Sequence, residues 1–134
     1  MTDRSELIEL HNRLSKTLDE ERGSSRDKRH DKGYRTAREN LEDLADKDSF
    51  VEYGQLAIAA QKSRREIEEL RTETAADGII TGFGKINSEI LDDKKALSAI
   101  IINDYSVLAG TQGFYHHKKL DRICETAEEQ NLPV

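Results

Sequence analysis

Residues 99–102 have the sequence Ala-Ile-Ile-Ile, a continuous apolar run in a chain in which 36% of the residues are charged. A strand covered on one face alternates apolar and polar residues, whereas a strand buried on both faces is apolar throughout. The run therefore predicts a strand over residues 97–102 that is packed on both faces. The chain has 134 residues, of which 35% are hydrophobic, and this suits one modest domain with a small core.

Other segments also have strand character. Residues 79–83 and 85–90 are predicted as strands that precede the apolar run, and residues 50–53 as a short strand that ends at Gly54. The last residues, 132–134, are predicted to open a further buried strand, so we expect a truncated form or proteolytic fragment of a longer protein. Strands followed by a packing helix are typical of a layered or spiral α/β fold.

The first part of the chain is predicted to be polar and helical. Leucines at helical spacing indicate a helix over residues 4–22, with Asp3 and Glu6 as a capping box. Its apolar stripe is narrow, so the helix should lie against another surface. Residues 23–25 (Gly-Ser-Ser) are predicted to be a flexible break, and residues 63–72 suit a surface helix.

Two further helices have clearer start signals. Thr36 and Glu39 form a capping box for a helix over residues 37–45. Thr111 is predicted to cap a long helix over residues 112–130. The inner face of this long helix is predicted to consist of Leu120, Ile123, Cys124 and Ala127.

The charge is distributed unevenly along the chain. The formal net charge is -6, which argues against nucleic acid as the main partner, yet one stretch is strongly basic. This stretch favours a contact with a polyanion, and it is equally typical of a solvated basic loop that pairs with the acidic helices. Its basic residues are Arg22, Arg26, Lys28, Arg29, Lys32, Arg35 and Arg38.

Signals for export or membrane insertion are lacking in the sequence. No apolar run approaches the roughly 20 residues of a membrane helix, and the first residues have no apolar core like that of a signal peptide. The single cysteine, Cys124, excludes an internal disulfide and fits a reducing compartment. We therefore expect a cytoplasmic protein with no membrane partner.

The segment 107–113 (Val-Leu-Ala-Gly-Thr-Gln-Gly) is the candidate for ligand binding. Small residues let a ligand approach the backbone, and a helix start offers free N–H groups and the positive end of a dipole. A phosphate or thioester oxygen would fit there, with Lys118, Lys119 and Arg122 within the next three turns. A plain packing turn is an equally good interpretation of this glycine-rich segment alone.

His116 and His117 raise the question of a metal site. Adjacent residues of a helix point about 100° apart, so the two rings do not converge on one ion. No cysteine or carboxylate cluster completes a site, and we expect one histidine to face the protein and the other solvent. No metal is predicted, and Cys124 is interpreted as a small buried hydrophobe.

Three segments together resemble a known family. They are Arg35–Leu41 (RTARENL) with Asp48–Gly54 (DSFVEYG), Asp77–Gly84 (DGIITGFG), and Asn103–Gly113 (NDYSVLAGTQG) followed by His117-Lys118-Lys119 and Asp121-Arg122. In this order and spacing they are similar to the N-terminal part of the carboxyltransferase subunit of biotin-dependent acyl-CoA carboxylases, of the acetyl-/propionyl-CoA type. The resemblance runs over nearly the whole chain.

The resemblance implies a fold and a division of the chain. The fold would be a truncated crotonase-like spiral of β-β-α units, in the α/β class, preceded by polar N-terminal helices. Residues 1–48 would form the helical arm with the basic segment, and residues 49–134 an incomplete carboxyltransferase N-domain. The oxyanion glycines that are expected to be catalytic would follow Val134, so no catalytic residue is assigned within the chain.

The resemblance also implies an activity and its partners. A full-length enzyme would transfer a carboxyl group from carboxybiotin to a short acyl-CoA, such as acetyl- or propionyl-CoA, as in fatty acid metabolism. Biotin would be carried on a partner and bound mainly by the missing C-terminal half. Other partners would be the biotin carboxyl carrier, the biotin carboxylase and further copies of the full-length chain. The residues expected to bind acyl-CoA are Leu108, Ala109, Gly110, Thr111, Gly113, Lys118, Lys119, Arg122, Arg29 and Arg35.

The sequence departs from the family's pattern at two places, and two other functions are also compatible with it. Ala109-Gly110 stands where many relatives have two glycines, which leaves the acyl preference open, and residues 94–96 interrupt the usual short turn between strands. A biotin-dependent acyl-CoA decarboxylase of the same fold, or a non-catalytic acyl-CoA-binding or assembly module, would have a similar sequence. The chain alone is expected to be inactive in each case.

Overall fold

The computed structural model describes residues 4–134, and its centre is a small antiparallel sheet. The strand order is β1-β2-β3, with β1 at Val51–Tyr53, β2 at Ile79–Lys85 and β3 at Leu97–Asn103. In the β2–β3 pair, Ile79 lies opposite Asn103 and Lys85 opposite Leu97. The fold is therefore in the α/β class, and the strands predicted near residues 50, 79 and 97 are confirmed.

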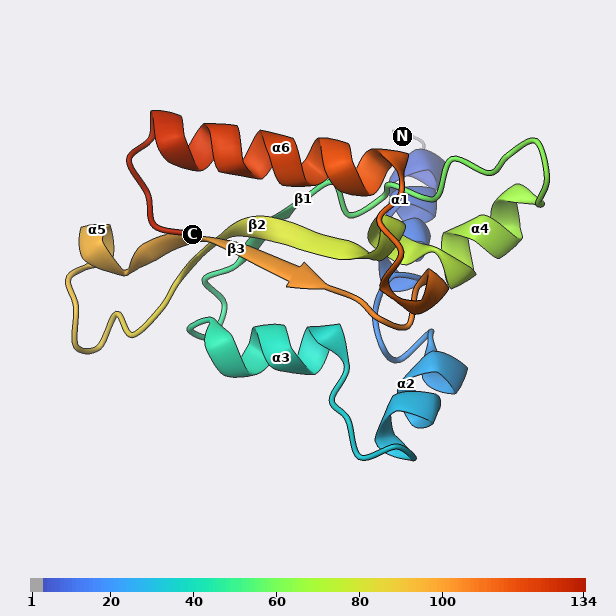
Figure 1. Ribbon diagram of the computed structural model, residues 1–134, viewed down its shortest axis with the longest axis horizontal. Helices are drawn as coiled ribbons and strands as arrows, with labels where there is room; N and C mark the ends of the chain where they lie inside the picture. The colour runs from blue at the N-terminus through green and yellow to red at the C-terminus, as the bar shows by residue number, and fades with distance from the viewer. Residues whose placement is uncertain (1–3) are drawn as a thin grey trace.

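The sheet lies between two helices. Helix α6 (Phe114–Glu129) covers one face and α3 (Ala37–Leu44) covers the other (Figure 1). Ile80 and Ile100 pack with the side chains of α3, while Ala99 packs with Ile123 and Ala127 of α6. Neighbouring residues of β3 thus serve opposite faces, and this is why its sequence is apolar throughout.

The remaining elements form the arm and the connections. Their bounds are α1 (Ser5–Ser15), α2 (Gly23–His30), α4 (Ile67–Glu73), α5 (Asp93–Ala96) and the short 3-10 turns Ala75–Gly78 and Leu108–Gly110. The arm crosses from α1 to α2 and α3 on one side of the molecule, as Figure 1 shows in blue and cyan. None of the helices among residues 4–134 is both long and apolar enough to cross a membrane.

The start of α3 has the capping box that the sequence predicts. Thr36 Oγ1 accepts a hydrogen bond from the Glu39 amide at 3.1 Å, and Glu39 Oε2 accepts one from the Thr36 amide at 2.8 Å. Thr36 Oγ1 also donates to Asp19, which ties the segment before α2 to the start of α3. Two amides that would otherwise be unpaired are satisfied in this way.

The prediction of a single helix over residues 4–22 is wrong in its extent. Helix α1 ends at Ser15, where the hydroxyls of Ser15 and Thr17 donate to the carbonyls of Asn12 and Leu14. Such local bonds offer the backbone an alternative to further helix. The break lies there, because α2 begins at Gly23 and includes the predicted flexible segment. The proposed Asp3 cap lies outside the described residues.

A second correction concerns residues 85–90, which do not form a strand after Lys85. Asn87 has a φ of 58°, and the Asp46 carboxylate accepts hydrogen bonds from the amides of Asn87 and Ser88 at 3.0 and 2.9 Å. These bonds hold the chain in a turn. The following residues form the single-turn helix α5, where the sequence showed an interrupted connection.

Candidate functional site

The connection between β3 and α6 contains the segment expected to bind a ligand. Leu108, Ala109 and Gly110 have φ angles of 48°, 52° and 79°, all in the left-handed region that non-glycine residues rarely adopt. Val107 is buried beneath them, and its carbonyl accepts a hydrogen bond from the Gly110 amide at 3.0 Å. Leu108 and Ala109 are exposed, so the turn presents its strained backbone to solvent.

The start of α6 is occupied by a carboxylate of the chain itself. Asp77, which is 2% exposed, accepts a hydrogen bond from the His116 amide at 2.9 Å. A Cβ atom on Gly113 would lie 3.0 Å from Asp77 Oδ1, so glycine lets the carboxylate approach. Thr111 is therefore not the cap that the sequence predicts; its hydroxyl donates to the Leu108 carbonyl at 2.7 Å. The expected free N–H groups at this helix start are partly used by Asp77.

The Lys119 side chain is bound to two backbone carbonyls around the start of β2. Its Nζ donates to the Ala76 carbonyl at 2.7 Å and also to the Ile79 carbonyl. Burial lowers the pKa of Lys119 to about 8, although the neighbouring Glu52 acts in the opposite direction. A CoA phosphate would have to compete with two carbonyls for this ammonium group.

The other cations of α6 are exposed. Lys118 Nζ lies 5.0 Å from the centre of the Phe114 ring, a cation–π contact. Arg122 lines a pocket of about 290 Å³ beside β1, together with Tyr53 and Lys119. Leu108, Ala109 and Gly110 do not line this pocket.

Arg29 and Arg35 of the basic stretch are placed differently. The Arg29 guanidinium lies 4.8 Å from the ring centre of Tyr34 and 5.6 Å from that of Tyr105, and its Nε donates to the Arg35 carbonyl. Arg29 therefore connects the arm to the chain just after β3. The Arg35 side chain pairs with Asp43 at 2.8 Å on the exposed side of α3.

An open groove of about 370 Å³ brings the basic arm and the turn together. One wall comes from the start of α2, with Ser24, Ser25 and Lys28, and the other includes Ser106 and Leu108. Two segments that the sequence marked independently as anion-binding and ligand-binding candidates thus share one surface. The full lining is Glu21, Arg22, Ser24, Ser25, Lys28, Thr72, Glu73, Ser106 and Leu108.

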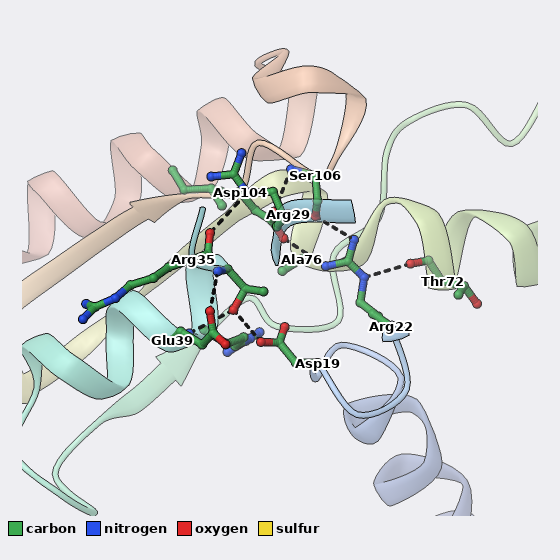
Figure 2. A network of polar contacts seen from close by, with 12 residues as sticks. Asp19, Arg22, Arg29, Arg35, Glu39, Thr72, Ala76, Asp104 and Ser106 are labelled. Carbon is green, nitrogen blue, oxygen red and sulfur yellow. Dashed lines mark hydrogen bonds and ion pairs between the residues drawn. The ribbon is translucent and has the colours of Figure 1, made fainter. Parts of the chain in front are cut away.

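Arg22 lines this groove, and three acceptors hold its guanidinium (Figure 2). Its guanidinium donates to Asp104 Oδ2 at 2.9 Å, to Ser106 Oγ at 3.2 Å and to the Thr72 carbonyl at 3.2 Å. The exposed fractions of the Arg22 and Asp104 side chains are 5% and 15%. Ser106 in turn donates to Asp104, which closes the network.

Asp77 and the Arg22–Asp104 pair are the features that the sequence did not reveal. Arg22 was one of seven similar basic residues, and its spacing does not distinguish it from the others. For Asp77 a signal exists, because an Asp-Gly pair directly before a strand marks a turn whose carboxylate is free to cap another element. It does not say which helix the carboxylate caps.

The two adjacent histidines point to different environments, as expected. His116 is 1% exposed, with Nδ1 3.1 Å from the Asp77 carbonyl, and its Nε2 has no hydrogen-bond partner among the described residues. His117 is exposed. Over residues 4–134 no three His, Cys, Asp or Glu side chains gather as a metal site would require. Cys124 is exposed, so its interpretation as a buried residue is wrong.

Comparison with known proteins gives a consistent family. Residues 28–134 match the carboxyl transferase domain. The biotin-dependent acetyl-/propionyl-coenzyme A carboxylase beta5 subunit of Mycobacterium tuberculosis is 31% identical over 134 residues, which are 99% of this chain and 22% of that protein. The chain thus spans about a fifth of the curated relative.

Two solved structures have the same fold over nearly the whole chain. A single-chain, multi-domain long-chain acyl-CoA carboxylase is 47% identical, with a TM-score of 0.95 over 99% of this chain and 13% of its own. The transcarboxylase 12S hexamer with methylmalonyl-coenzyme A and methylmalonic acid bound is 25% identical, with a TM-score of 0.69 over 95% of this chain and 23% of its own. The family match covers well over half of the residues, and the chain therefore belongs to the carboxyl transferase domain family.

Proposed function

We propose that this chain is the acyl-CoA-binding part of a biotin-dependent carboxyltransferase and is inactive alone. The observation that carries the proposal is the shared groove, which sets Lys28 and two serines of the arm opposite the strained turn at Leu108. CoA is a polyanion with a thioester at its far end, so the Lys28 ammonium suits its phosphates and the exposed backbone of the turn suits its thioester, whereas Glu21 and Glu73 of the same lining would oppose the phosphates. The 12S transcarboxylase, which shares the fold, was solved with methylmalonyl-coenzyme A bound.

In the proposed reaction the chain positions the substrate. The phosphates would lie along the arm, and the acyl group would pass over Leu108–Gly110 toward glycine-rich turns supplied by the remaining length of the protein. Those turns would hold the enolate oxygen with paired N–H groups. Because Asp77 occupies the start of α6, we place the thioester against the exposed turn and not at the helix end. Lys118, Lys119, Arg122, Arg29 and Arg35 stay predictions as ligands of CoA.

The finer architecture is also proposed. Strands β2 and β3 with α6 would be one β-β-α unit of a crotonase-like spiral, and the division into residues 1–48 and 49–134 would separate the arm from this unit. Helix α3 packs on the sheet although the division places it in the arm. In the cytoplasmic full-length protein, a biotin carrier, a biotin carboxylase and further copies of the chain would complete the enzyme.

Titration of the ¹⁵N-labelled chain with CoA and propionyl-CoA, followed by NMR, tests the proposal. We expect amide shifts at residues 24–28 and 106–113, with an affinity that falls as salt is raised. Lys28→Gln should weaken binding several-fold, whereas Lys47→Gln, an exposed lysine beyond α3, should not. Shifts confined to other surfaces, or none at millimolar CoA, would contradict the proposal.

A further inference from the structure

Arg22 is the most deeply buried cation of the basic arm. The other basic residues of the stretch are partly or fully exposed, whereas Arg22 is 6% exposed and has three separate acceptors. A buried guanidinium is stable only when its donors are satisfied, so the three acceptors fix its position and its position fixes theirs.

The acceptors of Arg22 come from two segments that lie apart in the sequence. The Thr72 carbonyl belongs to α4, while Asp104 and Ser106 belong to the chain that leads from β3 into the turn. Figure 2 shows the guanidinium between these two segments. Asp104 Oδ1 also accepts hydrogen bonds from the amide and the hydroxyl of Ser106. The backbone just before Val107 is therefore bound on two sides.

The turn that follows needs such support. Leu108 and Ala109 hold left-handed backbone angles, and strain of this kind persists only where the surroundings determine the conformation. Val107 is fixed from below by burial, and the Asp104–Ser106 segment is fixed from the side by Arg22.

From this geometry we infer that Arg22 is a positioning residue: by holding Asp104 and Ser106 it sets the conformation of the Leu108–Gly110 turn that receives acyl-CoA. The inference rests on the proposed function for the identity of the ligand. Arg22 itself lines the groove and has its donors engaged by the protein, so its effect on the substrate passes through the turn.

The test compares two ion-paired arginines of the arm in the 134-residue chain. Arg38 pairs with Glu52 through two bonds, with side chains 14% and 9% exposed, and it lies at the interface of α3 and β1. Arg22→Gln and Arg38→Gln should both lower stability. Only Arg22→Gln should speed amide hydrogen exchange at residues 105–113 relative to β2 and β3, and only it should weaken CoA binding, by roughly tenfold.

A conservative variant separates positioning from folding. Arg22→Lys keeps the charge beside Asp104 but cannot reach three acceptors with a planar fork, so it should restore slow exchange at the turn and CoA affinity in part. In the full-length enzyme, Arg22→Gln should raise KM for acyl-CoA more than it lowers kcat.

Three results would overturn the inference. They are unchanged CoA affinity in Arg22→Gln, faster exchange spread evenly over the sheet in that variant, or the same loss of affinity in Arg38→Gln. If the wild-type chain does not bind CoA at all, the proposed function fails, and the exchange pattern at residues 105–113 still decides whether Arg22 positions the turn.

Discussion

Asp77 joins the start of β2 to the start of α6. It has a φ of 48° and follows Ala76, whose φ is 54°, so two consecutive residues take up the left-handed conformation before Gly78. This turn aims the Asp77 carboxylate at the His116 amide and the Ala76 carbonyl at Lys119. The Asp-Gly pair that marks the family in the sequence is thus explained by a cap supplied from another element.

Removal of this cap should cost stability. Asp77→Ala should lower the free energy of unfolding by about 1–2 kcal/mol, because the His116 amide loses its acceptor. Asp77→Asn should cost less, since asparagine accepts the same bond and tolerates left-handed angles. Urea unfolding followed by circular dichroism measures both. Thr111→Ala serves as the control, and a cost equal to that of Asp77→Ala would show that Thr111 is the cap.

Lys119 should make stability depend on alkaline pH. Its pKa is about 8 in the folded chain, where burial opposes the charge, and 10.5 is the ordinary value. The unfolded chain therefore binds more protons between these values, and stability should rise with pH through this window. Below pH 8 both states are protonated and the contribution is constant.

Unfolding in urea between pH 7.5 and 10.5 checks this sign. The unfolding free energy of the wild type minus that of Lys119→Met should increase with pH, because only the wild type loses the penalty of a buried charge. Lys118→Met, which changes the exposed neighbouring lysine, should give no such trend. A difference that is flat or falls with pH would refute the assignment.

At the scale of elements, two glycines of β2 explain how β1 and Phe50 pack. A Cβ atom on Gly82 would lie 2.2 Å from the Val51 carbonyl oxygen and 2.6 Å from the Phe50 ring, and one on Gly84 would lie 3.3 Å from the same ring. Phe50 thus packs directly on the backbone of β2, next to the side chains of α3. The glycines are needed for close approach, since neither has a left-handed φ.

Gly82→Ala should therefore displace β1. We expect a loss of about 1–3 kcal/mol in unfolding free energy, because carbonyl and ring must both move to admit a methyl group. Gly23→Ala is a matched control at the start of α2, where a Cβ atom would meet only the end of Arg26 at 3.5 Å. Thermal unfolding should separate the two variants clearly, and equal midpoints would contradict the packing argument.

The elements predicted from local signals were mostly found, and the errors have local causes too. Neighbouring residues determine the Thr36–Glu39 capping box and the alternation of faces around Ile100. The sequence alone therefore locates α3 and β3. The end of α1 and the turn at Asn87 depend on hydroxyl and carboxylate bonds to the backbone. Such bonds leave no periodic pattern in the sequence.

At the scale of the whole molecule, the contacts that build the candidate site were beyond the reach of sequence patterns. Arg22 and Asp104 lie 82 positions apart, and Asp77 meets His116 over 39. The resemblance to the family predicted the class of fold and pointed to the Gly110 turn, whose Leu108 lines the groove beside the basic arm; the role of the turn in binding stays a prediction. The resemblance also suggested Lys119 as a phosphate ligand, a role for which its carbonyl partners now compete.

The Arg22–Asp104 bond joins residues that are far apart in the sequence, and this has a consequence for the order of folding. Strands β2 and β3 pair through a short connection, whereas closing a loop of 82 positions costs more chain entropy and is delayed until the sheet exists. The part of the arm around Arg22 would then dock last, and its contacts would be the first to open in the native protein. Such an opening would release the Asp104–Ser106 segment without breaking a strand pair, so the turn could lose its conformation while the sheet stays folded.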